Sequence, residues 1–424
     1  MSPMCRSLKL KLPLKGLFLI ACAAPLHADD FSPSWRWNAF ASQGAIHTSD
    51  NNFFGRSDDS VSTEFRELGL LLGAEPLQDL QLSAQFLSRE AGEVDETDFQ
   101  VDYAFATYDF YAGVDALFGI KAGRIRAPVG FYNETRDVAH TRPSILLPQS
   151  VYPERLRDLT FSRDGVQLFG SYQFGLSSLN LDLSYAELNI SGDDYPELIG
   201  IDSLPGEVET PYAPMARLIY DWDLGRARLG VTYADFSATY KPIPGQELDI
   251  SFDYWVLSAE YNAARWSLIA EYSTFDSNLE DIGDLNALLG GSMPMDPAAL
   301  EGYGGLSGYD SADLAELGAL AGGNLRYSTK GFGYYIQGVY RITPAWDAFL
   351  RWDVTYSDEE DRDNPFLYTK DVTTGVGWRL DSNWLMRAEW HVIEGNSILS
   401  TRENRPQDLK KYWQMVLFQI SYRI

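Results

Sequence analysis

The segment 346-WDAFLRWDVTY-356 alternates between apolar and polar side chains with a period of two. One face carries Trp346, Ala348, Leu350, Trp352, Val354 and Tyr356, and the other carries Asp347, Phe349, Arg351, Asp353 and Thr355. Because successive side chains of a β-strand point to opposite faces, this pattern predicts a strand with one face suited to lipid and the other to water.

The same alternation recurs over much of the chain, and in the last segment Tyr412 and Tyr422 stand at the two ends of the apolar face. Aromatic residues at both ends of an apolar stripe are typical of membrane-crossing strands, because the two membrane–water interfaces favour them. The pattern predicts sixteen strands, at residues 34–48, 62–74, 80–89, 99–109, 116–126, 164–174, 179–190, 212–222, 226–238, 250–262, 265–276, 331–342, 346–356, 369–380, 384–395 and 410–423.

The connections between these strands alternate strictly between short and long. Seven connections are at most six residues long, and the other eight are longer. A closed antiparallel barrel with tight turns at one end and long loops at the other predicts this alternation, whereas the crossovers of a β-sandwich do not. We therefore expect one all-β domain, a 16-stranded antiparallel transmembrane barrel, with a large soluble all-β protein as the alternative.

The first residues have the pattern of a secretory signal. Four basic residues precede the apolar run 16–24, and Ala28 offers a small residue for cleavage before Asp29. The run is far shorter than the ~20 residues of a membrane helix. A lipoprotein signal with Cys22 as the lipidated residue is the competing interpretation. We expect residues 1–28 to be removed and 29–424 to form the barrel domain.

Composition excludes several classes of function. The chain has 34 Lys and Arg against 60 Asp and Glu, a formal net charge of -26, which makes nucleic acid an improbable partner. Both cysteines, Cys5 and Cys22, lie in the predicted signal, so the rest of the chain has no thiol for a disulfide or a metal. Without an HExxH, CxxC or Walker motif we expect no enzyme activity, metal or cofactor. His140 and Ser144 come nearest to a hydrolase pair, with no specified geometry.

Arginines concentrate in one irregular segment of this acidic chain. Seven lie between residues 123 and 163, which read GRIRAPVGFYNETRDVAHTRPSILLPQSVYPERLRDLTFSR. Residues 127–163 form the third long connection, which is rich in apolar side chains and contains four prolines that prevent a regular strand. A long apolar loop in a barrel has one favourable place to bury its side chains, so we expect it to fold inside the wall.

This region resembles the third external loop of bacterial outer-membrane porins, which folds into the lumen. The run GRIRAPVG at residues 123–130 is similar to the phosphate-selective porin group. The resemblance implies a passive diffusion channel for small hydrophilic solutes in the outer membrane of a Gram-negative bacterium. It also implies a homotrimer in contact with outer-membrane lipid and lipopolysaccharide.

Two sets of residues are expected at the pore. The predicted constriction contains Arg124, Arg126, Arg136, Arg142, Arg155, Arg157, Arg163, Glu134 and Asp137. Strand parity predicts a pore wall with Arg217, Arg228, Arg351, Arg387, Asp353 and Glu389, together with the acids Asp102, Asp182, Asp253 and Glu271. The arginines could favour anionic or carboxylated solutes, or they could pair with neighbouring acids and pin the loop. Both interpretations stay open at this stage.

The sixth long connection, residues 277–330, has eight acids against two basic residues. It is expected to be a solvated external cap, and divalent-cation binding at the cell surface is the sharper alternative. A passive channel is the function that the sequence predicts. The alternative is a barrel whose external loops act as an adhesin or ligand-binding surface.

Overall fold

The computed structural model describes residues 32–154, 157, 162–188, 207–210, 212–241, 248–282, 325–400 and 402–424. The predicted signal, residues 1–28, and most of the acidic connection 277–330 lie outside the described residues. Residues Pro33–Ile424 form one compact unit. No helix within the described ranges is long and apolar enough to cross a membrane.

Seventeen antiparallel strands of the described chain join into a single sheet. Sixteen are long, and the three-residue β8 lies in the connection between β7 and β9. Their bounds are β1 (Ser34–Thr48), β2 (Phe65–Leu77), β3 (Leu80–Ala91), β4 (Asp95–Ala112), β5 (Ala116–Arg126), β6 (Ser162–Phe174), β7 (Ser177–Leu188), β8 (Glu207–Glu209), β9 (Tyr212–Trp222), β10 (Ala227–Lys241), β11 (Leu248–Asn262), β12 (Trp266–Ile282), β13 (Leu325–Arg341), β14 (Trp346–Tyr356), β15 (Tyr368–Arg379), β16 (Trp384–Gly395) and β17 (Tyr412–Arg423).

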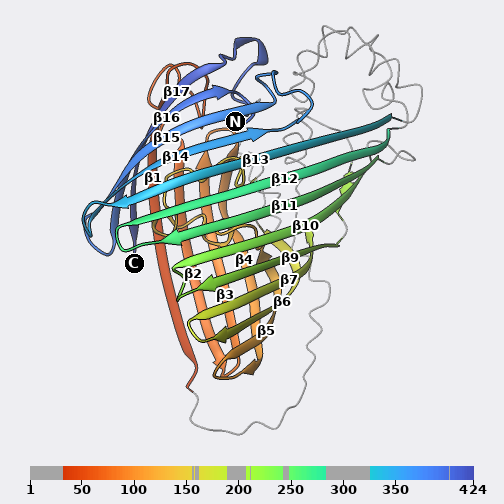
Figure 1. Ribbon diagram of the computed structural model, residues 1–424, viewed down its shortest axis with the longest axis vertical. Helices are drawn as coiled ribbons and strands as arrows, with labels where there is room; N and C mark the ends of the chain where they lie inside the picture. Colours follow the sequence, from red (N-terminus) through yellow and green to blue (C-terminus); the bar gives the residue numbers. More distant parts are fainter. Residues whose placement is uncertain are drawn as a thin grey trace, which may run out of the picture. The chain divides into compact units, whose positions relative to one another are not determined.

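The sheet closes on itself because the first strand pairs with the last. Phe40 of β1 is in register with Gly69 of β2 on one side and with Arg423 of β17 on the other. Each remaining long strand pairs with its neighbours in sequence, so the strands form the continuous wall seen in Figure 1. A closed antiparallel barrel of sixteen long strands is therefore confirmed.

The predicted strand bounds differ from the structure mainly at the loop ends. Five predicted segments, 34–48, 116–126, 212–222, 346–356 and 384–395, have the bounds that the structure gives. β12 and β13 extend several residues beyond the predicted 265–276 and 331–342, and the sequence did not predict β8. Three residues are too few to show a period of two.

Side-chain burial follows the alternation that the sequence predicts. In β14, Arg351 is 1% exposed, whereas the neighbouring Leu350 is 61% exposed. Large apolar residues are exposed on the outer face of many strands, including Leu168, Leu257, Trp352 and Trp390. Charged and polar side chains on the inner face are buried. The barrel therefore has an apolar outside and a polar inside, the reverse of a soluble sandwich.

Two apolar clusters fill part of the interior. One joins Phe54 from the connection 49–64, Ile145 and Leu146 from the connection 127–161, and Trp413 of β17. The other packs Leu147, Val151 and Tyr152 of the same connection against inward residues of β9 to β13. The connection 127–161, named the lumen loop from here on, contributes to both clusters and is therefore held by packing as well as by charge.

The outer face provides a test of membrane insertion. Leu350 is the fifth residue of the eleven-residue strand β14, near its middle, and points outward. We expect Leu350→Arg to lower the free energy of unfolding in lipid vesicles by about 2–4 kcal/mol, because it places a charge in the hydrocarbon layer. Leu224→Arg, in the turn after β9, should have little effect. Equal urea-unfolding midpoints for the two variants would contradict this orientation.

Candidate functional site: the lumen loop

The lumen loop, residues 127–161, contacts the inner wall around much of its circumference. Its polar partners include Glu67 of β2, Thr232 of β10, Glu271 of β12, Asp353 of β14 and Arg387 of β16. At its deepest point His140 donates from Nε2 to the carbonyl of Asn383, at 3.1 Å. Asn383 lies in a short turn at the opposite end of the barrel from the start of the loop. The loop therefore reaches from the end of the barrel with the long connections to the end with the short turns.

Asp137 is the centre of the loop's first ionic anchor. Its carboxylate pairs with Arg126, at the end of β5, and with Arg157 of the loop, and it accepts a hydrogen bond from Gln85 of β3 at 3.0 Å. Asp102 of β4 also accepts from Arg126, at 2.7 Å. Burial acts to raise the pKa of Asp137, but Arg157 and Arg126 outweigh it and hold the pKa well below its usual value.

Glu154 forms the second ionic anchor near the end of the loop. One carboxylate oxygen pairs with Arg136 of the loop at 2.8 Å, and the other pairs with Arg89 of β3 at 2.6 Å. Arg89 also pairs with Asp95 at 2.7 Å. Burial acts to raise the pKa of Glu154, but Arg136 and Arg89 lower it to about 2. The carboxylate therefore stays charged at any physiological pH.

On the β14–β16 side the wall holds the loop by its backbone. Arg387 donates to the carbonyls of Ala139 and Arg142, both at 2.6 Å. Arg351 donates to the carbonyl of Leu146 at 2.9 Å and to the Ser144 hydroxyl, which itself donates to that carbonyl. Glu389 accepts from the backbone N–H of Ile145.

On the opposite side of the loop, Arg142 pairs with Glu67 of β2 at 3.0 Å. His140 and Ser144 thus have separate partners, and neither bond belongs to a hydrolase pair.

A third anchor surrounds the buried carboxylate of Glu271 in β12. It accepts hydrogen bonds from the hydroxyls of Tyr335 at 2.6 Å and Tyr152 at 2.7 Å, and from the backbone N–H of Phe131 at 3.1 Å. Gly130 precedes Phe131 with a φ of +53°, and a Cβ there would lie 2.3 Å from the Tyr152 hydroxyl and 2.7 Å from Glu271. Glycine is therefore required for the loop to approach this carboxylate.

The predicted wall arginines of β9 and β10 are also paired. Arg217 pairs with Glu134 of the loop at 2.6 Å and with Asp182 of β7 at 2.7 Å. Arg228 pairs with Asp221 at 2.9 Å and lies over the ring of Phe131, 4.6 Å from its centroid. Both guanidinium groups therefore orient the loop and contribute little uncompensated positive charge to the lumen.

Arg163 belongs to a buried part of the wall. Its side chain is fully buried and donates to the carbonyls of Ala186 at 2.7 Å and Ala213 at 2.5 Å. The guanidinium also lies 5.4 Å from the ring centroid of Phe236. The remaining predicted constriction residue, Arg155, lies outside the described residues.

The expectation that Arg124 lines the constriction is wrong. Arg124 is in register with Asp164 and pairs with it at 2.9 Å. Asp164 directly follows the buried Arg163 in β6, so the two side chains point to opposite faces of the wall. The Asp164 side chain is half exposed, so this pair lies on the outer face of the barrel. Parity alone puts Arg124 and Arg126 on one face, but β5 ends at Arg126, where the chain turns inward.

The expectation for Asp253 is also wrong. The inward residue of β11 is the next one, Tyr254, whose hydroxyl donates to the carbonyl of Val151 in the loop at 3.1 Å. Asp253 is on the opposite face, where it accepts a hydrogen bond from Tyr233. The predicted parity of β11 was therefore wrong by one residue.

Two central residues, Glu67 and Arg89, are absent from the sets predicted from the sequence. They are in register on β2 and β3 and are both almost fully buried. The available signal was their strand parity, since both are charged residues on inward positions. Arg126, Arg136, Arg142 and Arg157 all pair with carboxylates. For these four arginines the pinning interpretation therefore applies.

Comparison with solved structures supports the fold. No model of a known protein family matches the chain, and no curated protein matches it in sequence. OmpT of Vibrio cholerae is 10% identical with a TM-score of 0.53, over 94% of this chain and 99% of that one. An anion-selective porin from Comamonas acidovorans is 11% identical with a TM-score of 0.53, over 93% and 100%. The channel DcaP of Acinetobacter baumannii is 13% identical with a TM-score of 0.52, over 92% and 97%.

The Glu154 anchor gives a pH-dependent prediction. We expect Glu154→Gln to lower the free energy of unfolding by about 3–5 kcal/mol at neutral pH, because it leaves two buried guanidinium groups without their shared partner. A carboxyl with a depressed folded-state pKa stabilises the fold above its unfolded pKa and loses this effect as pH falls. The difference from the unmodified protein should therefore be constant near neutrality and shrink between pH 4.5 and about 2.

Chemical unfolding in detergent at a series of pH values measures this difference. The matched control is Glu359→Gln, which removes an exposed carboxylate from the connection between β14 and β15. The control should unfold like the unmodified protein throughout. A destabilisation by Glu154→Gln that grows as the solution is acidified would contradict the ionic anchor.

Proposed function

We propose that this protein is a porin-type channel of the Gram-negative outer membrane, through which small hydrophilic solutes diffuse passively. The observation that carries the proposal is the closed barrel with an apolar outer face and the lumen loop inside it. A barrel that leaves no strand edge unpaired and faces lipid on its outside is suited to a membrane. A charged, hydrogen-bonded interior is suited to water and polar solutes.

A mild preference for anionic solutes is part of the proposal. It rests on three inward-facing cations in the half of the lumen near the short turns. Lys121 lies over the rings of Phe105 and Phe169, Arg341 donates to the carbonyl of Ala263 and the hydroxyl of Ser267, and Arg423 donates to the carbonyl of Ser382. None of these partners carries a charge. Their positive potential would act on solutes that pass within a Debye length, which is about 8 Å at physiological salt.

The likeness to the Comamonas porin supports this preference only weakly, because 11% identity carries the fold and no residue roles. The three cations of this chain support the preference instead. The homotrimer and the contacts with outer-membrane lipid and lipopolysaccharide stay predictions. Chemical cross-linking of the protein in native membranes tests the trimer.

Removing part of the lumen loop tests the channel. Deletion of residues 138–152 should raise single-channel conductance in planar bilayers several-fold, because this segment occupies the lumen beside β14, β15 and β16. The wall should stay closed, since its backbone hydrogen bonds do not involve the loop. Deletion of residues 359–362, in an external connection, should leave conductance unchanged. Unchanged conductance in a folded 138–152 deletion would exclude the loop as the restriction.

Charge substitutions test the selectivity. We expect Lys121→Gln combined with Arg341→Gln to shift the reversal potential under a potassium chloride gradient toward cation preference. Arg405→Gln, which removes an exposed charge from the external connection 396–411, should produce no shift at physiological salt. The Debye length there is about 8 Å, so salt screens this external charge from solutes in the lumen. A double variant with the reversal potential of the unmodified channel would contradict the proposed anion preference.

A further inference from the structure

Glu403 lies in the connection between β16 and β17 and accepts three hydrogen bonds from the backbone of two other connections. Its Oε2 accepts from the N–H of Phe54 at 3.0 Å, and its Oε1 accepts from those of Gly55 at 2.7 Å and Glu93 at 3.0 Å. Phe54 and Gly55 belong to the connection between β1 and β2, and Glu93 belongs to the turn between β3 and β4. One side chain therefore joins three segments that are far apart in the sequence. We call these segments the external latch: residues 49–64, 92–94 and 396–411.

The backbone around Glu403 is shaped for this contact. Phe54 and Gly55 have φ angles of +54° and +89°, so their successive N–H groups form a concavity of the kind that holds an anion. Gly92 has a φ of +57°, and a Cβ there would overlap Oε1 of Glu403, so glycine is required. Burial raises the pKa of Glu403 to about 7. Because carboxyl oxygens accept hydrogen bonds in both protonation states, the contact does not require the charged form.

Two asparagines add further bonds between the first and last segments of the latch. Asn404 accepts from the N–H of Asn52 and donates to its carbonyl, both at 2.9 Å. Asn51 accepts from the N–H of Lys410 at 2.7 Å and donates to its carbonyl at 2.8 Å. The two connections are therefore bound to each other on both sides of Glu403.

The external latch packs against the lumen loop. Phe54 and Leu399 of the latch belong to the same buried apolar cluster as Ile145 and Leu146 of the loop. Arg351 holds the carbonyl of Leu146 at 2.9 Å, so this cluster includes the part of the loop that faces β14–β16. The latch belongs to the end of the barrel with the long connections, so it covers this part of the loop from the external side.

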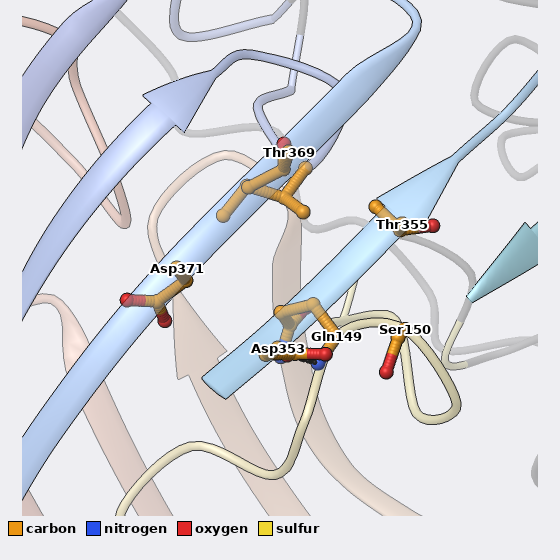
Figure 2. Close-up of a pocket in the computed structure, with 7 residues that line it drawn as sticks. Gln149, Ser150, Asp353, Thr355, Thr369 and Asp371 are labelled. Carbon is orange, nitrogen blue, oxygen red and sulfur yellow. Dashed lines mark hydrogen bonds between the residues drawn. The ribbon is translucent and has the colours of Figure 1, made fainter. Parts of the chain in front are cut away.

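The contact between latch and loop is incompletely packed at one place. A cavity of about 10 Å³, room for one water molecule, lies where Ile398 of the latch meets the loop and β14 and β15. Figure 2 shows Gln149 and Ser150 on the loop, facing side chains from these two strands. Because protein interiors are otherwise close-packed, this gap marks a boundary along which latch and loop can separate.

We propose that the external latch is a gate over the lumen loop and that Glu403 keeps it closed. While its three hydrogen bonds are intact, Phe54 packs on the cluster that contains Ile145 and Leu146, and this part of the loop stays in the lumen. When the bonds break, the three segments of the latch separate, and the loop gains room to move away from β14–β16. Loop opening of this kind controls access in many proteins. The effect on conductance rests on the proposed channel function, whereas the latch itself is a property of the fold.

Hydrogen–deuterium exchange of the purified full-length protein in detergent tests the latch without reference to transport. Glu403→Ala removes the acceptor of all three N–H groups. The matched control is Asp408→Ala, which removes an exposed acid from the same connection. We expect Glu403→Ala to speed amide exchange about tenfold or more in residues 49–64 and 143–147, and to leave β9–β12 unchanged. The control should exchange like the unmodified protein, and equal exchange in the two variants would overturn the proposal.

Single-channel recording in planar bilayers tests the gate. Glu403→Ala should open more often to a higher conductance level than the unmodified protein or Asp408→Ala. Adding Glu93→Cys and Arg402→Cys allows the latch to be closed again with a short bismaleimide. Arg402 donates to the carbonyl of Glu93 at 3.3 Å, both side chains are exposed, and both native cysteines lie in the predicted signal. The cross-linked Glu403→Ala channel should return to the unmodified conductance.

The outcomes separate the gate from the channel. Faster exchange in Glu403→Ala with unchanged conductance, or a raised conductance that cross-linking does not reverse, would overturn the gate. An unmodified protein that passes no current would contradict the proposed channel and the gating with it, while the exchange result would still decide whether Glu403 closes the latch. If Glu403→Ala does not fold, Gly92→Ala replaces it, because its methyl group would displace Oε1 of Glu403 and should produce the same changes.

Discussion

The structure depends on one constraint: a charged loop inside a closed barrel must bring each of its buried charges to a partner. Removing one ion of a buried pair from its partner costs about 3–5 kcal/mol, whereas a matched pair is tolerated. Asp137 and Glu154 satisfy this constraint by each bridging two guanidinium groups, one from the loop and one from the wall. The segment is rich in arginine because of where it lies: the wall beside it carries the buried carboxylates of Glu67 on β2 and of Asp95 and Asp102 on β4.

The wall has a two-residue period and the loop has none, and this difference explains how deep the loop reaches. Strands alternate between lipid and water, so charged side chains such as those of Arg351, Asp353 and Glu389 point inward and form a lining before any loop is present. The loop has no period of its own and takes its path from that lining. At its tip, burial and then Arg423 and Arg387 lower the pKa of His140 to about 4. A neutral His140 can donate to the carbonyl of Asn383 without adding a further positive charge beside these arginines.

The sequence predicted the wall well and the loop's partners poorly, for a physical reason. A period of two is local, so the pattern of residues 346–356 alone indicates which side chains of β14 face inward. Which carboxylate meets which arginine depends on residues far apart in the chain, such as Arg142 and Glu67, which are 75 positions apart, and a local pattern carries no information about such pairs. Where parity failed, as at Arg124 and Asp253, the strand ended nearby or the phase was wrong by one residue. The fold was therefore predictable, and the pairing inside it was not.

The two sides of the loop are held with unequal strength, which bears on how solutes could pass. Toward β2–β5 the contacts are buried ion pairs, whose rupture leaves charges unpaired. Toward β14–β16 Arg387 and Arg351 hold backbone carbonyls, and hydrogen bonds of this kind contribute about 1.5–3 kcal/mol each. A solute that displaces part of the loop would meet the weaker contacts on the β14–β16 side. We expect the segment facing β14–β16 to move first, while Asp137 and Glu154 keep the remainder attached to the wall.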